Sequence, residues 1–211
     1  MGAMVGAAQN AALTRINREP LASQALLEQL AGSLLPEWAT MRDSIRVIEL
    51  EPRGTLFTQE SEHPFIYVVR RGLLKNIYLR EDGEEWVKSF IHEGMFFASF
   101  PALQPGGRTS FSAVAIESTT VERMPFAPLD ALAHRHLAWG SLMQRALMIF
   151  AERKEKRERE LLTLSPEERY RAFVSETPEL AERIPQKDLA RYLGLTPVGL
   201  NRIAKRVRVG G

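Results

Sequence analysis

The chain of 211 residues has the composition of an ordinary globular protein, with 45% hydrophobic and 26% charged residues, so it can bury a sizeable core. Its length favours two domains. Because it contains no cysteine, a disulfide framework, a thiolate metal site and a cysteine-ligated iron–sulfur cluster are excluded. No apolar run approaches the roughly 18 to 20 residues that span a bilayer, and we expect a cytoplasmic protein without a membrane partner.

The first part of the chain predicts a β-rich domain at residues 21–136. Residues 1–20 lack a basic leader followed by a dense apolar block, and we expect them to form a flexible lead. Helical spacing then predicts one or two short covering helices in LASQALLEQLAGSLLPEWATM. From Ser44 to Phe126, short β-rich runs broken by turn residues predict an antiparallel barrel or roll. Asp82-Gly83 predicts a hairpin with a type I′ turn, and Gly72 and Gly94 are expected to close other turns.

A proline-free segment at residues 137–164 predicts a single helix roughly 40 Å long. Its first half carries one apolar stripe, formed by Leu142, Ala146, Ile149 and Phe150. Such a stripe favours packing against a partner helix in a homodimer, and the alternative is packing on the helix's own domain. The second half, AERKEKRERE, is nearly all charge and is stabilised by ion pairs four residues apart.

Residues 165–211 predict a compact, all-helical domain. Ser165-Pro166-Glu167-Glu168 has the pattern of a capped helix start, with proline at the first helical position and glutamate at the third. Thr177-Pro178 and Thr196-Pro197 repeat the cap-then-proline pattern. Short helices are therefore expected to begin near residues 165, 177, 185 and 196.

The stretch QKDLARYLGLTPVGLNRIAKR, which begins at Gln186, has the spacing of a helix-turn-helix. Ala190 is small where two helices must cross closely, and Gly194 falls where the turn needs a left-handed residue. The core positions are apolar: Leu189, Leu193, Leu195, Leu200 and Ile203. From Pro185 onward the chain carries six basic residues against one acidic residue, the charge expected of a phosphate-binding surface.

On the second helix of this motif, the face opposite the core consists of Pro197, Val198, Asn201, Arg202 and Lys205. We expect Arg202 to donate two hydrogen bonds to guanine and Asn201 to contact adenine. Lys205 and Arg206 are placed to bind phosphates of duplex DNA. Lys187, at the start of the preceding helix, completes the predicted DNA-binding set. The alternative is that this helical hairpin contacts a protein partner.

The run LLTLSPEERYRAFVSETPELAERIPQKDLARYLGLTPVGLNRIAKR resembles the C-terminal half of Crp/Fnr-family transcription regulators, and the resemblance extends upstream to about residue 25. It implies an α+β fold. An N-terminal antiparallel β-roll, a double-stranded β-helix like the cyclic-nucleotide-binding domain, would act as an effector or sensor domain. It would be followed by a long dimerisation helix, a hinge near Leu164-Ser165 and a C-terminal helix-turn-helix. The resemblance also implies a homodimer on a two-fold symmetric operator and contact with RNA polymerase.

Two departures from the family pattern affect DNA and effector recognition. Family recognition helices often use arginine, glutamate and arginine, but here the first two positions are Pro197 and Val198 and only Arg202 remains. The operator should therefore differ from that of the family's best-known members. Whether the regulator activates or represses transcription is left open by these residues.

The second departure lies in the phosphate-binding cassette, where the family has glycine, glutamate and leucine, then arginine and serine or threonine. This chain has Ala98, Ser99 and Phe100, followed by Arg108 and Thr109. The resemblance implies an effector pocket at Ser99, Arg108 and Thr109, but Ser99 is not a charged acceptor for a ribose hydroxyl. This argues against cyclic AMP or cyclic GMP as the effector, with another small ligand, or none, as the alternatives.

An enzyme or a metal site is not expected. The only close histidine pair, His134 and His136, is two residues apart in a predicted helix, so the side chains point to different faces. No nucleophile elbow, phosphate loop or HExxH motif is present. We predict no catalytic residues and no metal ligands. The competing hypothesis is a ligand-sensing module whose helical domain binds a protein instead of DNA.

Overall fold

A computed structural model describes residues 14–15 and 21–209 of the chain. Most of the predicted flexible lead, residues 1–20, therefore lies outside the described residues. The exception is Thr14–Arg15, which forms a short strand, β1, paired antiparallel with the first strand of the β-rich domain. At these two positions the chain is part of a sheet and not a free lead.

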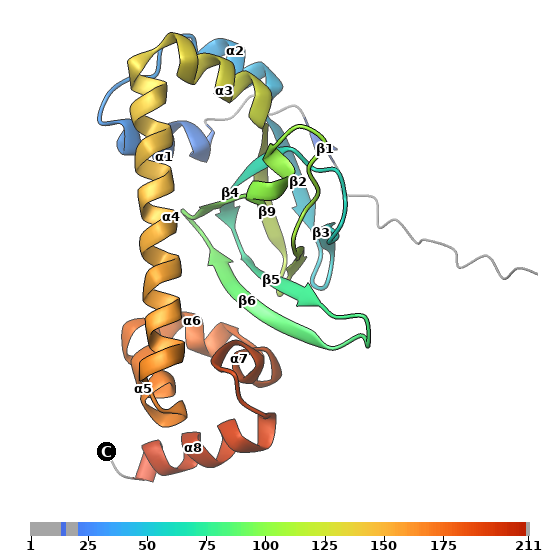
Figure 1. Ribbon diagram of the computed structural model, residues 1–211, viewed down its shortest axis with the longest axis vertical. Helices are drawn as coiled ribbons and strands as arrows, with labels where there is room; N and C mark the ends of the chain where they lie inside the picture. The colour runs from blue at the N-terminus through green and yellow to red at the C-terminus, as the bar shows by residue number, and fades with distance from the viewer. Residues whose placement is uncertain (1–13, 16–20, 210–211) are drawn as a thin grey trace, which may run out of the picture.

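The described residues alternate short helices and strands at first and are entirely helical after residue 125 (Figure 1). In chain order the elements are β1 (Thr14–Arg15), α1 (Ala22–Ala31), α2 (Trp38–Ser44), β2 (Arg46–Leu50), β3 (Thr55–Phe57), β4 (Phe65–Arg71), β5 (Leu73–Leu79), β6 (Glu85–His92), β7 (Phe96–Phe97), the 3-10 helix η1 (Phe100–Leu103), β8 (Ser112–Ala115), β9 (Thr119–Pro125), α3 (Phe126–Arg135), α4 (Leu137–Thr163), α5 (Pro166–Glu176), α6 (Pro178–Arg183), α7 (Gln186–Leu193) and α8 (Pro197–Val209).

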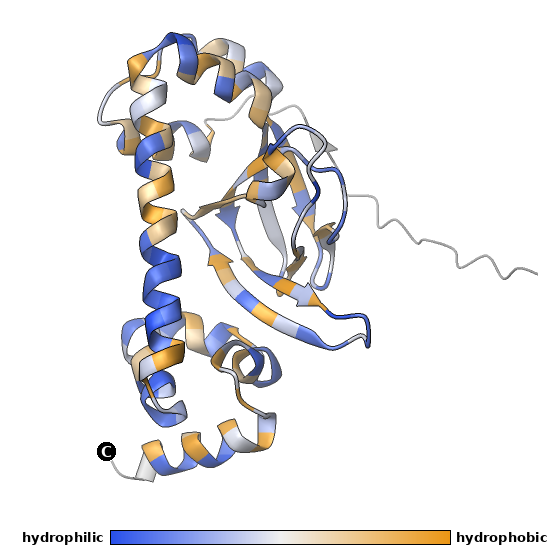
Figure 2. Cartoon of the chain, in the orientation of Figure 1, coloured by the Kyte–Doolittle hydropathy of each residue, from blue (hydrophilic) through white to orange (hydrophobic). Residues whose placement is uncertain are grey.

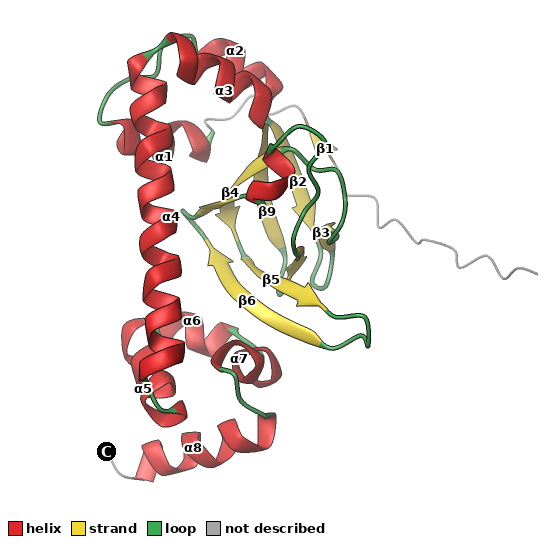
Figure 3. Cartoon of the chain, in the orientation of Figure 1, coloured by secondary structure: helices red, strands yellow, loops and turns green. Residues whose placement is uncertain are grey.

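The strands form the predicted antiparallel β-roll, so the α+β fold class is confirmed. One sheet has the order β1-β2-β9-β4-β7 and the other has the order β3-β8-β5-β6. Alternating apolar side chains from both sheets meet in the interior of the roll, and Tyr67, Val121, Leu74 and Ala113 are fully buried there. Figure 3 shows α4 along one side of this roll, α2 and α3 above it, and α7 and α8 below it.

The hairpin between β5 and β6 is confirmed, but its predicted turn type is wrong. A type I′ turn requires positive φ at both central residues, and only Gly83 has it, at 81°. The backbone N–H of Gly83 donates to the carbonyl of Arg80, and Arg80 donates to Glu84. The connection is therefore a longer loop with a glycine in the left-handed conformation. Gly72 and Gly94 also have positive φ, as expected for turns.

The long helix α4 packs its predicted apolar stripe on its own domain, which corrects the prediction that this stripe meets a partner helix. Leu142 is 2% exposed and lies in one cluster with Met124 and Leu129. Ala146 and Phe150 line a small cavity against the roll. The stripe was misassigned because its spacing is the same for both kinds of packing. The charged second half of α4 continues away from this cluster, as the colours of Figure 2 show.

The C-terminal helices begin close to the predicted positions, and the helix-turn-helix docks on the roll. Ser165 and Glu168 form the predicted reciprocal capping box. The hydroxyl of Thr177, in contrast, donates back to the carbonyl of Phe173 and does not cap α6. The docked surfaces form a third apolar cluster, with Leu73 and Phe90 of the roll against Leu189 of α7.

A buried carboxylate ties the covering helices to the roll. Glu122 of β9 is fully buried, and its two oxygens accept hydrogen bonds of 2.8 Å from the backbone N–H groups of Ala22 and Ser23 at the start of α1. Arg70 lies 3.3 Å from the same carboxylate. A negative charge at a helix N-terminus satisfies N–H groups that have no partner within the helix. This contact replaces the side-chain cap that Leu21 cannot supply.

We predict that Glu122→Ala lowers the free energy of unfolding by about 3 kcal/mol, because the half-buried guanidinium of Arg70 and two helix N–H groups lose their acceptor. The measurement is urea denaturation at neutral pH. Glu49→Gln, on the exposed face of β2, is the matched control and should change it by less than about 0.5 kcal/mol. Equal stability of both variants would contradict this role of Glu122.

Candidate DNA interface and effector pocket

The helix-turn-helix is formed by α7 and α8, and its core residues are buried as their spacing predicted. Leu189, Leu193, Leu200 and Ile203 are each at most 5% exposed. Gly194 ends α7 with φ of 70°, which fits the predicted left-handed turn residue. The N–H of Leu195 donates to the carbonyl of Ala190, which folds the turn back. The Thr196 hydroxyl accepts from the N–H of Gly199, so α8 has its predicted N-cap.

All predicted DNA-contacting side chains are exposed on the face of α8 opposite its core, or at the start of α7. The exposed set is Lys187, Pro197, Val198, Asn201, Arg202, Lys205 and Arg206. Val198 is 61% exposed, which is high for an apolar residue beside basic ones. Arg206 differs from the others because it pairs with Glu167 of α5 at 3.1 Å. Figure 1 shows α8 at the end of the molecule farthest from α3, uncovered by the roll.

Ion pairs hold the helix-turn-helix against the roll. Arg183, the last residue of α6, donates to Glu93 at 2.9 and 3.0 Å and also to Glu117. Lys75 of β5 donates to Asp188 of α7 at 2.8 Å. Arg191 of α7 pairs with Glu85 of β6. Two charges that the sequence counted toward the basic DNA surface, Asp188 and Arg191, therefore face the roll instead.

The surroundings of Glu93 stabilise the ionised form of its carboxyl group. Partial burial alone would raise the pKa of Glu93, but hydrogen bonds from Arg183 and from the backbone N–H of Gly72 outweigh it and lower that pKa to about 2. Hydrogen bonds to Glu117 and to Glu93 raise the pKa of Arg183. Because the carboxyl pKa is lower in the folded protein, the contact contributes its full stability at pH values above the ordinary carboxyl pKa. That contribution is lost as the pH falls toward the lowered pKa.

The predicted effector residues do not converge on a cavity. The guanidinium of Arg108 donates to the carbonyl of Glu60 at 2.7 Å and lies 3.3 Å from the carboxylate of Glu62, and its side chain is 55% exposed. The buried hydroxyl of Thr109 donates to the carbonyl of Thr58. The Ser99 hydroxyl accepts from the backbone N–H of Ser110. These residues hold the loop after η1 on the roll, and the hydrogen-bonding groups of all three are already engaged.

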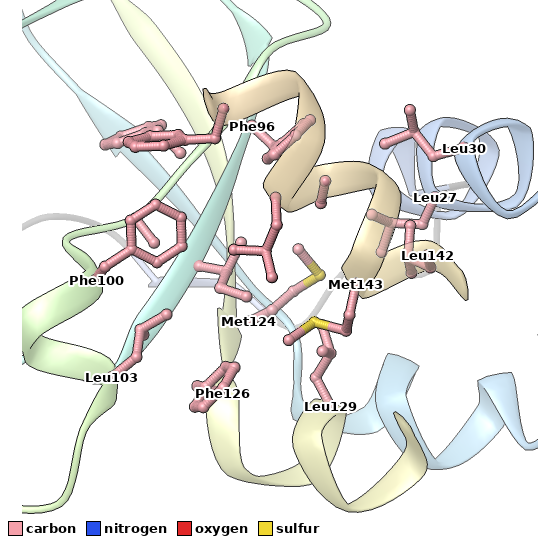
Figure 4. Close-up of a pocket in the computed structure, with 16 residues that line it drawn as sticks. Leu27, Leu30, Phe96, Phe100, Leu103, Met124, Phe126, Leu129, Leu142 and Met143 are labelled. Carbon is pink, nitrogen blue, oxygen red and sulfur yellow. The ribbon is translucent and has the colours of Figure 1, made fainter. Parts of the chain in front are cut away.

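A small cavity next to η1 is lined only by hydrophobic side chains. Its volume is about 60 Å³, and it lies between α1, α4 and the roll. Figure 4 shows Phe96, Phe100, Leu103, Met124 and Met143 around it, with no nitrogen or oxygen on these side chains. A nucleotide phosphate would find no donor there.

A much larger groove was not predicted from the sequence. It has a volume of about 760 Å³ and runs between β6, the charged half of α4 and the helices α5 and α7. Its cationic lining residues, which include Lys88, Arg153 and Lys154, come from elements far apart in the sequence. Burial lowers the pKa of Lys88 to about 8, with a smaller effect from the neighbouring charge of Lys154.

The two histidines considered as metal ligands bind different partners. His134 in α3 contacts the carbonyl of Asp130, whereas His136 lies between α3 and α4 and contacts Glu37 at 2.7 Å. Within the described part of the chain, no group of three His, Cys, Asp or Glu side chains could hold a metal ion. The described helices include none that is long and apolar enough to cross a membrane.

Comparisons with known proteins agree with this architecture. Residues 47–136 match the family model of the cyclic nucleotide-binding domain. The chain is 28% identical over 174 residues to the fumarate and nitrate reduction regulatory protein of Escherichia coli, which covers 74% of this chain and 66% of that relative. The Klebsiella oxytoca fumarate nitrate reduction regulatory protein matches to the same extent. This chain thus spans slightly less than two thirds of these relatives.

Two solved structures share the fold. FixK2 from Bradyrhizobium japonicum has a TM-score of 0.70 at 19% identity, covering 78% of this chain and 85% of FixK2. A mutant of CooA from Carboxydothermus hydrogenoformans has a TM-score of 0.67 at 16% identity, covering 88% and 85% of the two chains. The chain is thus similar in sequence to regulatory proteins and shares its fold with FixK2 and CooA. That it is a Crp/Fnr regulator without a catalytic role stays a prediction.

We predict that Arg183→Met lowers the free energy of unfolding at neutral pH by about 1.5 to 3 kcal/mol, the range for hydrogen bonds to charged groups. Because the pKa of Glu93 is depressed from 4.5 to about 2, the difference from wild type should shrink as the pH falls through that interval. Urea denaturation at a series of pH values measures both effects.

The matched control is Arg171→Met, which removes an ion pair with Glu167 one turn earlier in α5. This change should lower the free energy of unfolding by less than about 0.5 kcal/mol. An Arg183 variant as stable as this control would show that the ion pairs do not hold the docked domain.

Proposed function

We propose that this protein is a dimeric, sequence-specific DNA-binding regulator of transcription. The observation that carries the proposal is the exposed basic face of α8 above a fully packed helix-turn-helix core. A recognition helix must place its base-reading side chains in the major groove while the preceding helix crosses the backbone. Arg202, Asn201 and Val198 are the base-reading candidates, with Pro197 beside them, and Lys205, Arg206 and Lys187 are the phosphate-binding candidates.

The proposed dimer seam begins on the face of α4 opposite the roll, and its last positions, Glu158 and Leu162, border the large groove. Residues spaced alternately by four and three follow this face: Leu137, Ser141, Gln144, Met148, Ala151, Glu155, Glu158 and Leu162. Leu137, Met148 and Leu162 are 86%, 57% and 77% exposed. This spacing is that of a coiled-coil seam. Glu155 and Glu158 would meet their own copies across the axis, so the first half of α4 supplies most of the attraction.

Further parts of the proposal rest on the family resemblance. We propose residues 21–136 as the sensor domain, 137–164 as the dimerisation helix and 165–211 as the DNA-binding domain. A two-fold dimer predicts a two-fold symmetric operator. Four further points stay predictions: the protein contacts RNA polymerase, lies in the cytoplasm, binds no metal, and does not use cyclic AMP or cyclic GMP as its effector.

We predict that Met148→Asp converts the dimer to a monomer, because a carboxylate would be buried opposite its own copy in the seam. Light scattering after gel filtration at micromolar concentration gives the mass. Leu34→Asp places the same charge on a residue 80% exposed in the loop after α1 and should leave the dimer intact. A dimeric Met148 variant, or a monomeric wild type, would refute the proposed seam.

We predict that Arg202→Ala and Lys205→Ala weaken DNA binding in different ways. Loss of the bidentate base contact by Arg202 should cost about 1 to 3 kcal/mol of discrimination per half-site. Loss of Lys205 should weaken selected and scrambled duplexes alike and flatten the salt dependence. The measurement is a titration of each duplex at two salt concentrations, with the operator selected from random DNA.

If Arg202→Ala loses affinity equally for both duplexes, or loses none, α8 does not read bases through this residue. If wild type binds no duplex at all, the alternative of a ligand-sensing module with a protein partner takes its place.

A further inference from the structure

The large groove beside α4 has the size and lining of a ligand site. Its volume of about 760 Å³ lies within the range of roughly 300 to 1,000 Å³ for small-molecule pockets. Aromatic side chains from the roll, α4 and α7 line it, including Phe111, Phe150 and Tyr192. The lining contains seven basic residues and only three acidic ones: Lys88, Arg153, Lys154, Lys156, Arg157, Arg169 and Arg191 against Glu158, Glu160 and Glu176.

Lys88 is set into this groove by an irregularity of the sheet. In the pairing of β5 with β6, Ile77 is opposite Val87 and Asn76 is opposite Ser89, so Lys88 has no partner of its own. Such a β-bulge redirects a side chain and is common beside functional sites. The amine of Lys88 lies 4.8 Å from the ring centre of Phe111 and 5.5 Å from that of Phe150. It therefore bridges the roll and α4.

No carboxylate in the described part of the chain pairs with Lys88. The cation–aromatic contacts of its amine there are with the rings of Phe111 and Phe150, whose electron-rich faces attract a cation. Burial lowers the pKa of its amine to about 8. The aromatic rings therefore stabilise the charged amine less well than the water molecules that burial removes. A half-buried amine without a carboxylate partner is a favourable site for an anion.

Two further polar atoms of the lining have no hydrogen-bond partner. Asn76 is 1% exposed; its Nδ2 donates to Ser89, but its buried Oδ1 has no donor. The guanidinium of Arg157 lies 3.9 Å from the ring centre of Tyr192, and its buried Nη1 has no acceptor. Buried polar groups are nearly always satisfied, so these atoms point to an occupant that supplies their partners.

We propose that this groove binds an organic anion with an aromatic body, held by an ion pair between its carboxylate and Lys88. The inference deepens the sensor role within the proposed function and rests on it. The aromatic body would lie against Phe111 and Phe150, where flat apolar surface is available. The anchoring cation thus comes from a bulge in β6, whereas Arg108 of the cassette is engaged at Glu60 and Glu62.

The groove also explains how occupancy could reach the DNA-binding domain. Phe90, two residues after Lys88, lies 5.1 Å from Tyr192 of α7 and 6.4 Å from Phe173 of α5, measured between ring centres. Tyr192 in turn contacts Arg157 of α4. The same lining therefore touches the roll, the dimer helix and the helix-turn-helix.

The test is calorimetric titration of the full-length protein with 1-naphthoate and with 1-naphthamide, its uncharged analogue of similar size. We expect 1-naphthoate to bind wild type, and Lys88→Met to weaken that binding about tenfold or more, the size of one lost charge-assisted contact. Lys88→Arg, which keeps the charge, should retain most of the affinity. Arg42→Met, at an exposed cation of α2 outside the groove, is the matched control and should bind 1-naphthoate as wild type does.

Methionine is apolar and similar in length to lysine, so Lys88→Met should fold at least as stably as wild type, which a melting curve checks. Equal binding of 1-naphthoate to wild type and Lys88→Met would overturn the proposal. So would 1-naphthamide binding as tightly as 1-naphthoate, or no saturable binding of 1-naphthoate to wild type. The calorimetric titration contains no DNA, so an absence of 1-naphthoate binding would not contradict the proposal that the protein binds DNA. In the same way, a protein that binds no DNA could still be tested for 1-naphthoate binding.

Discussion

The docking of α7 on the outer face of β5 and β6 is the contact that determines where the proposed DNA-binding surface lies. Leu189, Ala190 and Leu193 pack on Leu73 and Phe90 of the roll, and the ion pair of Lys75 with Asp188 crosses the edge of this contact. Burial of apolar surface supplies the attraction, and the ion pairs specify the orientation. Because α7 uses its other side to pack on α8, the recognition helix is held facing outward.

Much of the fold could be predicted because local chemistry and tertiary structure agree in it. The capping box at Ser165, the glycine at position 194 and the proline at the start of α8 each specify a helix boundary through their own backbone preferences. The strands could be predicted because short β-rich runs are separated by turn residues. The two-residue strand β7 was missed because Phe96 and Phe97 are too short a run to show a period, and they pair only through Tyr67 and Val68 of β4.

Side-chain direction could not be predicted where it depends on long-range packing. The stripe through Leu142 and Ala146 fits a partner helix and its own roll equally well, and only the placement of α1 beside α4 decides between them. Arg108 follows a glycine pair as the family cassette requires, but Glu62, 46 residues earlier, draws its guanidinium outward. The bulge at Lys88 depends on pairing with β5 and leaves no mark in the sequence.

The packing around Arg157 sets a condition on any regulation through the groove. The Arg157 guanidinium stacks on the ring of Tyr192 and donates a hydrogen bond to the carbonyl of the same residue. The charged half of α4 and the end of α7 therefore either move together or separate at this contact. A ligand changes the balance between two such arrangements only by binding one of them more tightly. The ring of Phe150 is the contact between α4 and the Lys88 amine. An anion at Lys88 would therefore bind one arrangement more tightly only if the position of Phe150 differs between the two arrangements. If the proposed anion binds at Lys88, the contact of Phe150 on α4 with that amine is therefore the point through which its occupancy would act on the docked helix-turn-helix.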